Sequence, residues 1–174
     1  MAERYCSPSA EEHRQSAPPA VRCAVITVSD TRTAATDTSG QLIVTGLAGA
    51  GHSVVEHVVV PDEAAPLREA VLKFAASDAI DAVLLTGGTG IAARDQTPET
   101  IASLITKEIP GFGELFRMLS YQEIGAAAML SRAQGGMIDS TLVLTMPGST
   151  AAVRLAMEKL ILPELGHLVK HARR

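Results

Sequence analysis

The sequence predicts a single α/β domain with three layers, in which helices cover both faces of a doubly wound, mostly parallel sheet. Its 174 residues, 47% of them hydrophobic, are enough for one substantial core and too few for two. Strand-like apolar runs alternate with helix-like segments, and right-handed crossovers between parallel strands place helices on both faces of such a sheet. The runs are almost continuously apolar, which is typical of strands buried on both sides.

The first elements of the chain form a strand–helix–strand unit. Residues 21–28 are rich in Val and predict the first strand, and Ser39 is expected to cap a helix over about 40–48. That helix should end at the Gly-Ala-Gly segment 49–51. Residues 53–60, with five valines, predict the second strand.

The third strand leads directly into a glycine-rich turn. A helix is expected after 61–63, because apolar residues recur at helical spacing from Leu67 to Ala75. Residues 81–86 then predict the third strand, which opens into the turn Gly87-Gly88-Thr89-Gly90. Thr97 is expected to cap the next helix, with Pro98 as its first residue.

The second half of the chain has a less regular pattern. The stretch 108–114 contains one proline and two glycines and is expected to break the preceding helix, while 115–132 is expected to be mostly helical. Residues 141–146 predict the last core strand. Ser149 is expected to cap a helix, and a final short helix should follow Pro163.

The carboxyl ends of the predicted parallel strands share one edge of the sheet, which is where ligands bind in open α/β folds. The loops expected at that edge are those richest in polar residues and glycine. They hold Ser29 and Asp30 after the first strand, Pro61, Asp62 and Glu63 after the second, Gly87 to Gly90 with Asp95 after the third, and Pro147, Gly148 and Ser149 after the last.

The turn at 87–90 is interpreted as an anion cradle beside a carboxylate. Glycines let backbone N–H groups point at a ligand, and a helix that begins near Pro98 would direct its positive end toward the same place. Arg94 and Asp95 follow closely, and a phosphate nest next to a carboxylate that can hold Mg²⁺ suits phosphoryl or nucleotidyl transfer. A plain strand-to-helix turn is the alternative. Asp62 is better explained as a turn or N-cap residue, unless it faces the same cleft and shares magnesium with Asp95.

Composition excludes several other functions. A net charge of −4, with no Trp, two Tyr and three Phe, argues against nucleic-acid binding. No apolar run approaches the roughly 20 residues that a membrane span needs. Cys6 and Cys23 have no metal or redox spacing and are expected to be reduced thiols in a cytoplasmic protein. Residues 1–19 are expected to form a flexible N-terminal arm, and 20–174 the domain.

The remaining candidate side chains lack supporting motifs. His167 and His171 do not form an H-E-x-x-H zinc motif, and His57 has no partner that spacing reveals. Arg32 and Arg132 are expected on the solvated surface.

Several motifs in this order and spacing resemble the MogA/MoaB family of molybdenum cofactor biosynthesis. The resemblance extends over about 21–165, and the stretch 116–125 is most similar to the protein B branch of the family. The motifs are Thr27-Val28-Ser29-Asp30, Asp37-Thr38-Ser39-Gly40, Gly87-Gly88-Thr89-Gly90, Asp95-Gln96-Thr97-Pro98-Glu99, Gly111-Phe112-Gly113-Glu114, Ser131-Arg132-Ala133 and Met146-Pro147-Gly148-Ser149.

The resemblance implies the molybdopterin-binding (MogA-like) fold and an adenylyltransferase, which joins AMP from Mg-ATP to the terminal phosphate of molybdopterin and releases pyrophosphate. Asp95 and Asp62 would then position Mg²⁺ and the reacting phosphates. The alternative is a molybdopterin carrier or assembly subunit without turnover. The family also implies a homotrimer or a trimer-based hexamer. Substrate-binding residues implied in this way are Ser29, Asp30, Gly87, Gly88, Thr89, Gly90, Arg94, Thr97, Glu114, Ser131, Pro147, Gly148 and Ser149.

Overall fold

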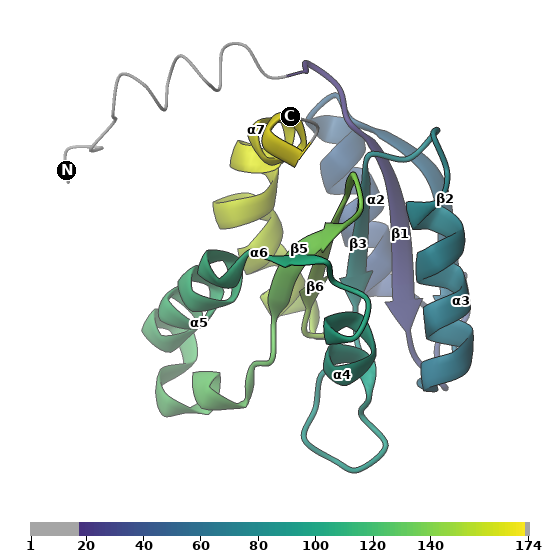
Figure 1. Cartoon of the computed structure of the whole chain (residues 1–174). Helices are drawn as coiled ribbons and strands as arrows, with labels where there is room; N and C mark the ends of the chain where they lie inside the picture. Colours follow the sequence, from purple (N-terminus) through teal and green to yellow (C-terminus); the bar gives the residue numbers. More distant parts are fainter. Residues whose placement is uncertain (1–17, 173–174) are drawn as a thin grey trace, which may run out of the picture.

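A six-stranded mixed sheet in the order β2-β1-β3-β6-β5-β4 forms the centre of the computed structural model, which describes residues 18–172 (Figure 1). The strands are β1 (Arg22–Val28), β2 (Ser53–Val60), β3 (Ala82–Thr86), β4 (Lys107–Glu108), β5 (Gln134–Ile138) and β6 (Thr141–Met146). The helices are α2 (Thr38–Gly49), α3 (Ala64–Ala75), α4 (Thr97–Ala102), α5 (Pro110–Ile124), α6 (Thr150–Ala156) and α7 (Leu162–Ala172). The predicted α/β class is confirmed, while all but two residues of the predicted arm lie outside the described part of the chain.

Helices cover both faces of the sheet, as the alternating pattern predicted. On one face α2, α5, α6 and α7 bury side chains such as Ile43, Phe116 and Val153 against the strands. On the other face α3 and α4 bury Phe74 and Ile101. None of the described helices is long and apolar enough to cross a membrane.

The strand order reverses between β1 and β3. The chain passes from β1 outward to β2, and then returns to the other side of β1 as β3. β1, β2, β3 and β6 run parallel and end level with one another, because Thr27 pairs with Thr86 and Thr86 pairs with Met146. The loops after β1 and β3 diverge from this point, which is the geometry that opens a ligand crevice in doubly wound sheets.

Two short strands were missed by the sequence patterns. β5 pairs antiparallel with β6, and β4 pairs with β5 at the edge. β5 contains Gly135 and Gly136, which have low strand propensity but allow close approach. A Cβ on Gly136 would lie 2.6 Å from Ile105 Cγ2 and 2.8 Å from the Lys107 carbonyl oxygen.

The helix boundaries in the second half also differ from the predictions. The stretch 108–114 does not remain irregular: β4 ends at Glu108, and α5 begins at Pro110, because proline fits the first turn of a helix, where its missing N–H is not needed. The expected helix over 115–132 ends at Ile124. Gly125 has φ +63, and the chain continues as a 3₁₀ helix, η1 (Gly125–Leu130).

Two of the three predicted helix caps are wrong. The cap of α2 is Asp37 and not Ser39, because the Asp37 carboxylate accepts the Gly40 N–H. Gln96 precedes α4, and Thr97 is its first residue. Ser149 caps α6 as predicted, through the Ala152 N–H. The helix expected after Pro163 begins at Leu162, one residue before the proline. A π-helical segment, η2 (Met157–Ile161), joins it to α6.

The tight packing at Gly136 gives a test of the β4–β5 arrangement. Gly136→Ala should destabilise the protein by about 1–3 kcal/mol, because the new methyl group must displace Ile105 and the β4 backbone. The measurement is urea unfolding followed by circular dichroism. Gly49→Ala is the matched control, since no atom lies within 4 Å of the added Cβ at this helical position. Equal stability of the two variants would contradict the observed edge pairing.

Candidate functional site

A cavity of about 270 Å³ lies at the carboxyl ends of the parallel strands, at the point where strand order reverses. It brings together segments that are far apart in the sequence. Three of the four loops predicted at this edge contribute to its wall, and the loop with Asp62 does not. Its walls are formed by Thr27, Val28, Ser29, Arg32, Asp37, Ser39, Thr86, Gly87, Gly88, Thr89, Gly90, Asp95 and Gly148. The structure therefore confirms that Asp95, the glycine turn and the loop after β6 meet at one edge of the sheet, as predicted.

The glycine turn follows β3 and fits only glycine at two positions. Gly87 and Gly88 have φ values of +100 and +60. A Cβ on Gly87 would collide with the Val28 carbonyl oxygen, and one on Gly88 would collide with Thr97 Oγ1. The turn therefore presents backbone to the cavity without intervening side-chain carbon atoms, as an anion cradle requires.

Thr97 lies beneath the glycine turn and does not line the cavity. It is fully buried, and its N–H donates to the Gly88 carbonyl at 3.2 Å. Its hydroxyl oxygen has no hydrogen-bond partner. The predicted substrate-binding residue is thus placed as a support of the turn.

Asp62 and Asp95 approach each other beside the turn. Asp62 Oδ1 lies 2.8 Å from where a Cβ of Gly88 would be, and Asp95 Oδ2 lies 2.5 Å from the equivalent point on Gly90. Burial and the negative charge of Asp95 together raise the pKa of Asp62, and the Gln96 N–H partly opposes this by donating to the carboxylate. Asp95 accepts the Ala92 N–H at 2.8 Å.

This donor set fits a hard divalent cation such as Mg²⁺. Carboxylate oxygens are its preferred protein ligands, and one or two carboxylates together with substrate phosphates are its usual environment. A cation between Asp62 and Asp95 would offset both causes that raise the pKa of Asp62, which are its burial and, after that, the negative charge of Asp95.

Asp30 and Arg94 connect the loops on the outer side of the site. Their side chains form an ion pair, and Asp30 Oδ1 also accepts the Asp62 N–H at 3.0 Å. The pair therefore joins the loops after β1, β2 and β3. Both side chains are partly exposed, with 66% of the Arg94 side chain and 36% of the Asp30 side chain accessible.

Arg132 supports the glycine turn from behind, although the sequence placed it on the solvated surface. Its guanidinium donates to the carbonyl oxygens of Thr89 at 3.2 Å and Asp95 at 2.8 Å, and to that of Gly90. It also pairs with Glu99, and only 26% of its side chain is exposed. No local pattern reveals these contacts, since 37 or more residues separate Arg132 from the three carbonyl groups.

Arg32 was also expected on the surface but contributes to the cavity wall. Its guanidinium donates to the Thr36 carbonyl at 2.9 Å, which keeps the loop after β1 folded at the mouth of the cavity. It brings a permanent positive charge to a wall that is otherwise formed by backbone, hydroxyl groups and carboxylates.

The other predicted residues lie around this centre. Glu114 lines a neighbouring cavity of about 320 Å³ with Arg117 and Arg132. Ser131 lines neither cavity, and its hydroxyl is buried without a hydrogen-bond partner. The Pro147 carbonyl accepts the Thr86 hydroxyl at 3.0 Å. Ser149 caps α6 and is not part of the cavity wall.

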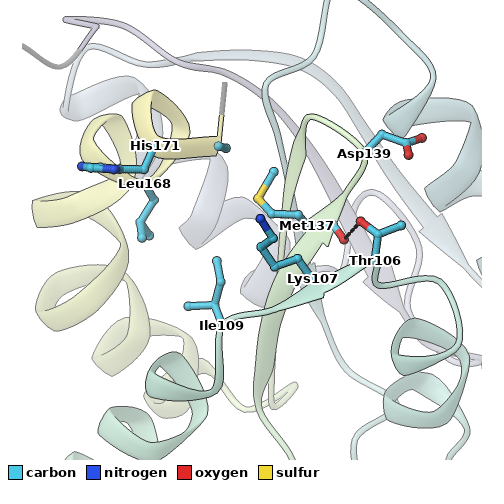
Figure 2. A pocket seen from close by; sticks show the side chains of 8 residues that line it. Thr106, Lys107, Ile109, Met137, Asp139, Leu168 and His171 are labelled. Carbon is cyan, nitrogen blue, oxygen red and sulfur yellow. Dashed lines mark hydrogen bonds between the residues drawn. The ribbon is translucent and has the colours of Figure 1, made fainter. Parts of the chain in front are cut away.

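A further cavity, of about 560 Å³, lies between β4, β5 and α7 and is shown in Figure 2. Apolar side chains such as Ile109, Met137 and Leu168 form much of its wall, together with Lys107 and His171. It contains none of the residues predicted to bind substrate.

The chain is similar in sequence to a known protein family. A family model described as a probable molybdopterin binding domain matches residues 24–167. Molybdenum cofactor biosynthesis protein B of Bacillus subtilis is 55% identical over 167 residues, covering 95% of this chain and 98% of the relative.

Solved structures of proteins from the same family have a similar fold. A crystal structure of molybdenum cofactor biosynthesis protein B has a TM-score of 0.88 at 54% identity, covering 91% of this chain and 99% of the other. The tungsten cofactor synthesizing protein MoaB of Pyrococcus furiosus has a TM-score of 0.78 at 39% identity and covers 91% of this chain and 100% of its own.

The raised pKa of Asp62, caused by burial and by the charge of Asp95, gives a pH-dependent prediction. Because the pKa of Asp62 is raised in the folded state, its negative charge opposes folding at pH 7, and this cost is absent below the ordinary pKa of aspartate, where both states are protonated. Asp62→Asn should therefore raise the melting temperature at pH 7 in metal-free buffer, and the gain should vanish at low pH.

Scanning calorimetry over a pH series checks this expectation. Glu63→Gln is the matched control, because the neighbouring Glu63 is exposed and makes no capping hydrogen bond. A lower melting temperature for Asp62→Asn at pH 7 would show that the carboxylate stabilises the loops and does not strain them.

Proposed function

This chain belongs to the family of probable molybdopterin binding domains, and we propose that it acts in molybdenum cofactor biosynthesis as a molybdopterin adenylyltransferase. The substrates are molybdopterin and ATP. The products are adenylyl-molybdopterin and pyrophosphate. The biosynthetic role rests on relatives that match nearly the whole chain. Adenylyl transfer is the reaction that the resemblance to the MogA/MoaB family implies, and the chemistry of the cavity supports it.

The proposed step exchanges one phosphoric anhydride bond for another. An oxygen of the terminal phosphate of molybdopterin attacks the α-phosphorus of ATP. The bond from that phosphorus to the β-bridging oxygen breaks, and pyrophosphate leaves with the electron pair. Little covalent chemistry is asked of the protein, so catalysis consists of orientation and stabilisation of negative charge.

The residues in the cavity wall and beside it have separate tasks in this step. Backbone N–H groups of the glycine turn would bind phosphate oxygens, apart from that of Gly87, which donates to the Met146 carbonyl, and Arg32 adds a positive charge at the mouth. Asp95 and Asp62 would hold Mg²⁺, which when bound supplies charge neutralisation for the phosphates. Arg132 and the pair Asp30–Arg94 keep the loops that carry these groups in register.

One observation carries the proposal. An acidic pair lies next to a glycine turn that has no room for side chains, at the strand ends where the sheet order reverses. Carboxylates alone would repel a phosphate, and amides alone would bind one without activating it. Their combination fits a metal-assisted transfer between phosphates.

Turnover and its dependence on Asp95 form the direct test. Purified protein is incubated with molybdopterin and Mg-ATP, and adenylyl-molybdopterin is quantified by mass spectrometry together with released pyrophosphate. Asp95→Asn should reduce the rate by roughly 10²–10³-fold, because a group that positions developing charge is lost. Its affinity for molybdopterin should remain close to that of the wild-type protein.

The matched control for this test is Asp139→Asn. Asp139 is exposed in the β5–β6 turn with φ 51, a conformation that asparagine accommodates, and it lies outside the cavity wall. If the wild-type protein binds molybdopterin but releases no pyrophosphate, it is a molybdopterin carrier and not an adenylyltransferase. Unchanged turnover in Asp95→Asn would remove this residue from catalysis.

We also propose that the chain forms a homo-oligomer, a trimer or a trimer-based hexamer, through α5 and η1. This segment exposes a concentration of large apolar side chains on a chain of net charge −4. They are Leu115, Met118, Tyr121, Ile124, Met129 and Leu130, with exposed fractions from 47% to 80%. Exposed large apolar side chains concentrated on one segment are typical of protein–protein interfaces, and a second copy of the chain is the partner proposed for this segment.

Assembly through this surface predicts that Tyr121→Glu and Met129→Glu weaken the oligomer. Each substitution places a charge in an apolar contact and should cost roughly 2 kcal/mol or more per interface. Sedimentation equilibrium measures the shift toward monomer. Leu72→Glu is the control, because Leu72 is also exposed but lies on α3. An unchanged mass in both variants, or a monomeric wild-type protein, would contradict the proposal.

A further inference from the structure

Asp37 is a buried carboxylate in the wall of a cavity proposed to bind phosphate. Only 2% of it is exposed. Its Oδ1 accepts the Gly40 N–H at 2.8 Å, and its Oδ2 accepts the Thr27 hydroxyl at 2.6 Å. The same Oδ2 lies 2.9 Å from Nε2 of His57. Four segments therefore meet at one side chain: β1, the loop after it, the start of α2, and β2.

Internal hydrogen bonds direct the Asp37 carboxylate toward the protein, where it holds neighbouring segments together. A bare carboxylate would repel a phosphate in the cavity, and burying it without partners would be costly. Here both oxygens accept hydrogen bonds from inside the protein, and His57 supplies the partner that comes from the neighbouring strand. The His57 side chain is 14% exposed and does not line the cavity.

The hydrogen-bond network of Thr27, Asp37 and His57 is packed tightly against Gly40. A Cβ on Gly40 would lie 2.6 Å from Thr27 Oγ1 and would collide with Asp37 Oδ2 and His57 Nε2. Glycine at this position therefore lets the first turn of α2 pack directly on the three side chains.

The start of α2 is in turn connected to the loop after β6. Ser39 donates its hydroxyl to the Gly148 carbonyl at 2.8 Å. Gly148 packs on the glycine turn, since a Cβ there would lie 3.2 Å from the Gly87 Cα. A continuous path of contacts thus runs from His57 through Asp37 and α2 to two loops of the cavity.

We propose that His57 is a positioning residue of this cavity. Its hydrogen bond to Asp37 fixes the first turn of α2, and through Ser39 it holds the Gly148 loop against the glycine turn. The catalytic meaning of this role rests on the proposed adenylyl transfer, whereas the mechanical link does not. His57 contacts no substrate in this assignment.

The test compares His57→Leu, which removes the hydrogen bond, with His57→Gln, whose Nε2 can still donate to Asp37. Glu56→Gln is the control, because Glu56 is the preceding residue and pairs with Lys73 instead. ATP binding is measured by calorimetry well below the melting temperature. His57→Leu should bind about tenfold more weakly, because a buried acceptor loses its partner, while His57→Gln and Glu56→Gln should retain most of the affinity.

Hydrogen exchange of the ligand-free proteins provides a readout that does not depend on ATP. His57→Leu should exchange faster in the segments 37–42 and 145–150, and His57→Gln should not. Equal exchange at 145–150 in His57→Leu and wild-type protein would overturn the inference, as would unchanged ATP affinity accompanied only by a lower melting temperature. Failure of the wild-type protein to bind ATP would instead refute the proposed function, and exchange would still decide the role of His57.

Thr27→Val covers the case in which His57→Leu does not fold. It removes the other hydrogen bond to Asp37 Oδ2 with almost no change of volume. The same exchange pattern is expected, because Thr27 and His57 act on the same Asp37 oxygen, and its absence would count against Asp37 as the link between the strands and the Gly148 loop.

Discussion

The close approach of the glycine turn to the end of β1 is the constraint on which the rest of the site depends. Gly87 packs against the Val28 carbonyl, so the backbones of neighbouring strand ends touch without a side chain between them. Gly148 then packs on Gly87 from the loop after β6. A cavity wall made of backbone can direct N–H groups at a ligand, and it can do so only while these contacts hold the turn in its left-handed conformation.

Electrostatics imposes a second demand on the same loops. Burial and, after it, the negative charge of Asp95 raise the pKa of Asp62, so ionisation of both carboxylates opposes their close approach when no cation lies between them. Arginines counter this tendency from outside the cavity. Arg132 binds the carbonyl of Asp95 and those of the turn, and Arg94 joins the loops through Asp30. Strain at a functional site is thus balanced by contacts that do not touch the ligand.

The sequence predicted those features that depend on local pattern or on strand topology. Buried parallel strands read as continuous apolar runs, and the turn at 87–90 followed the third run directly, so its place at the sheet edge could be inferred. Long-range hydrogen bonds could not be inferred from the sequence. Ser39 and Asp37 are both acceptable helix caps, and the choice was decided by Thr27 and His57. Arg132 had no local signal for its role, and β5 was hidden by its two glycines.

The segment that sequence patterns described least well connects the cavity to the exposed apolar surface. The chain leaves the sheet at β4, forms α5 and η1, and re-enters it at β5 (Figure 1). Leu130 ends the exposed surface, and Arg132 follows two residues later with its guanidinium on the glycine turn. Two residues span at most about 7 Å, so any contact that orders η1 also restricts where the Arg132 backbone can lie. One short stretch of chain therefore connects the exposed side of α5 and η1 to the arginine that holds the glycine turn.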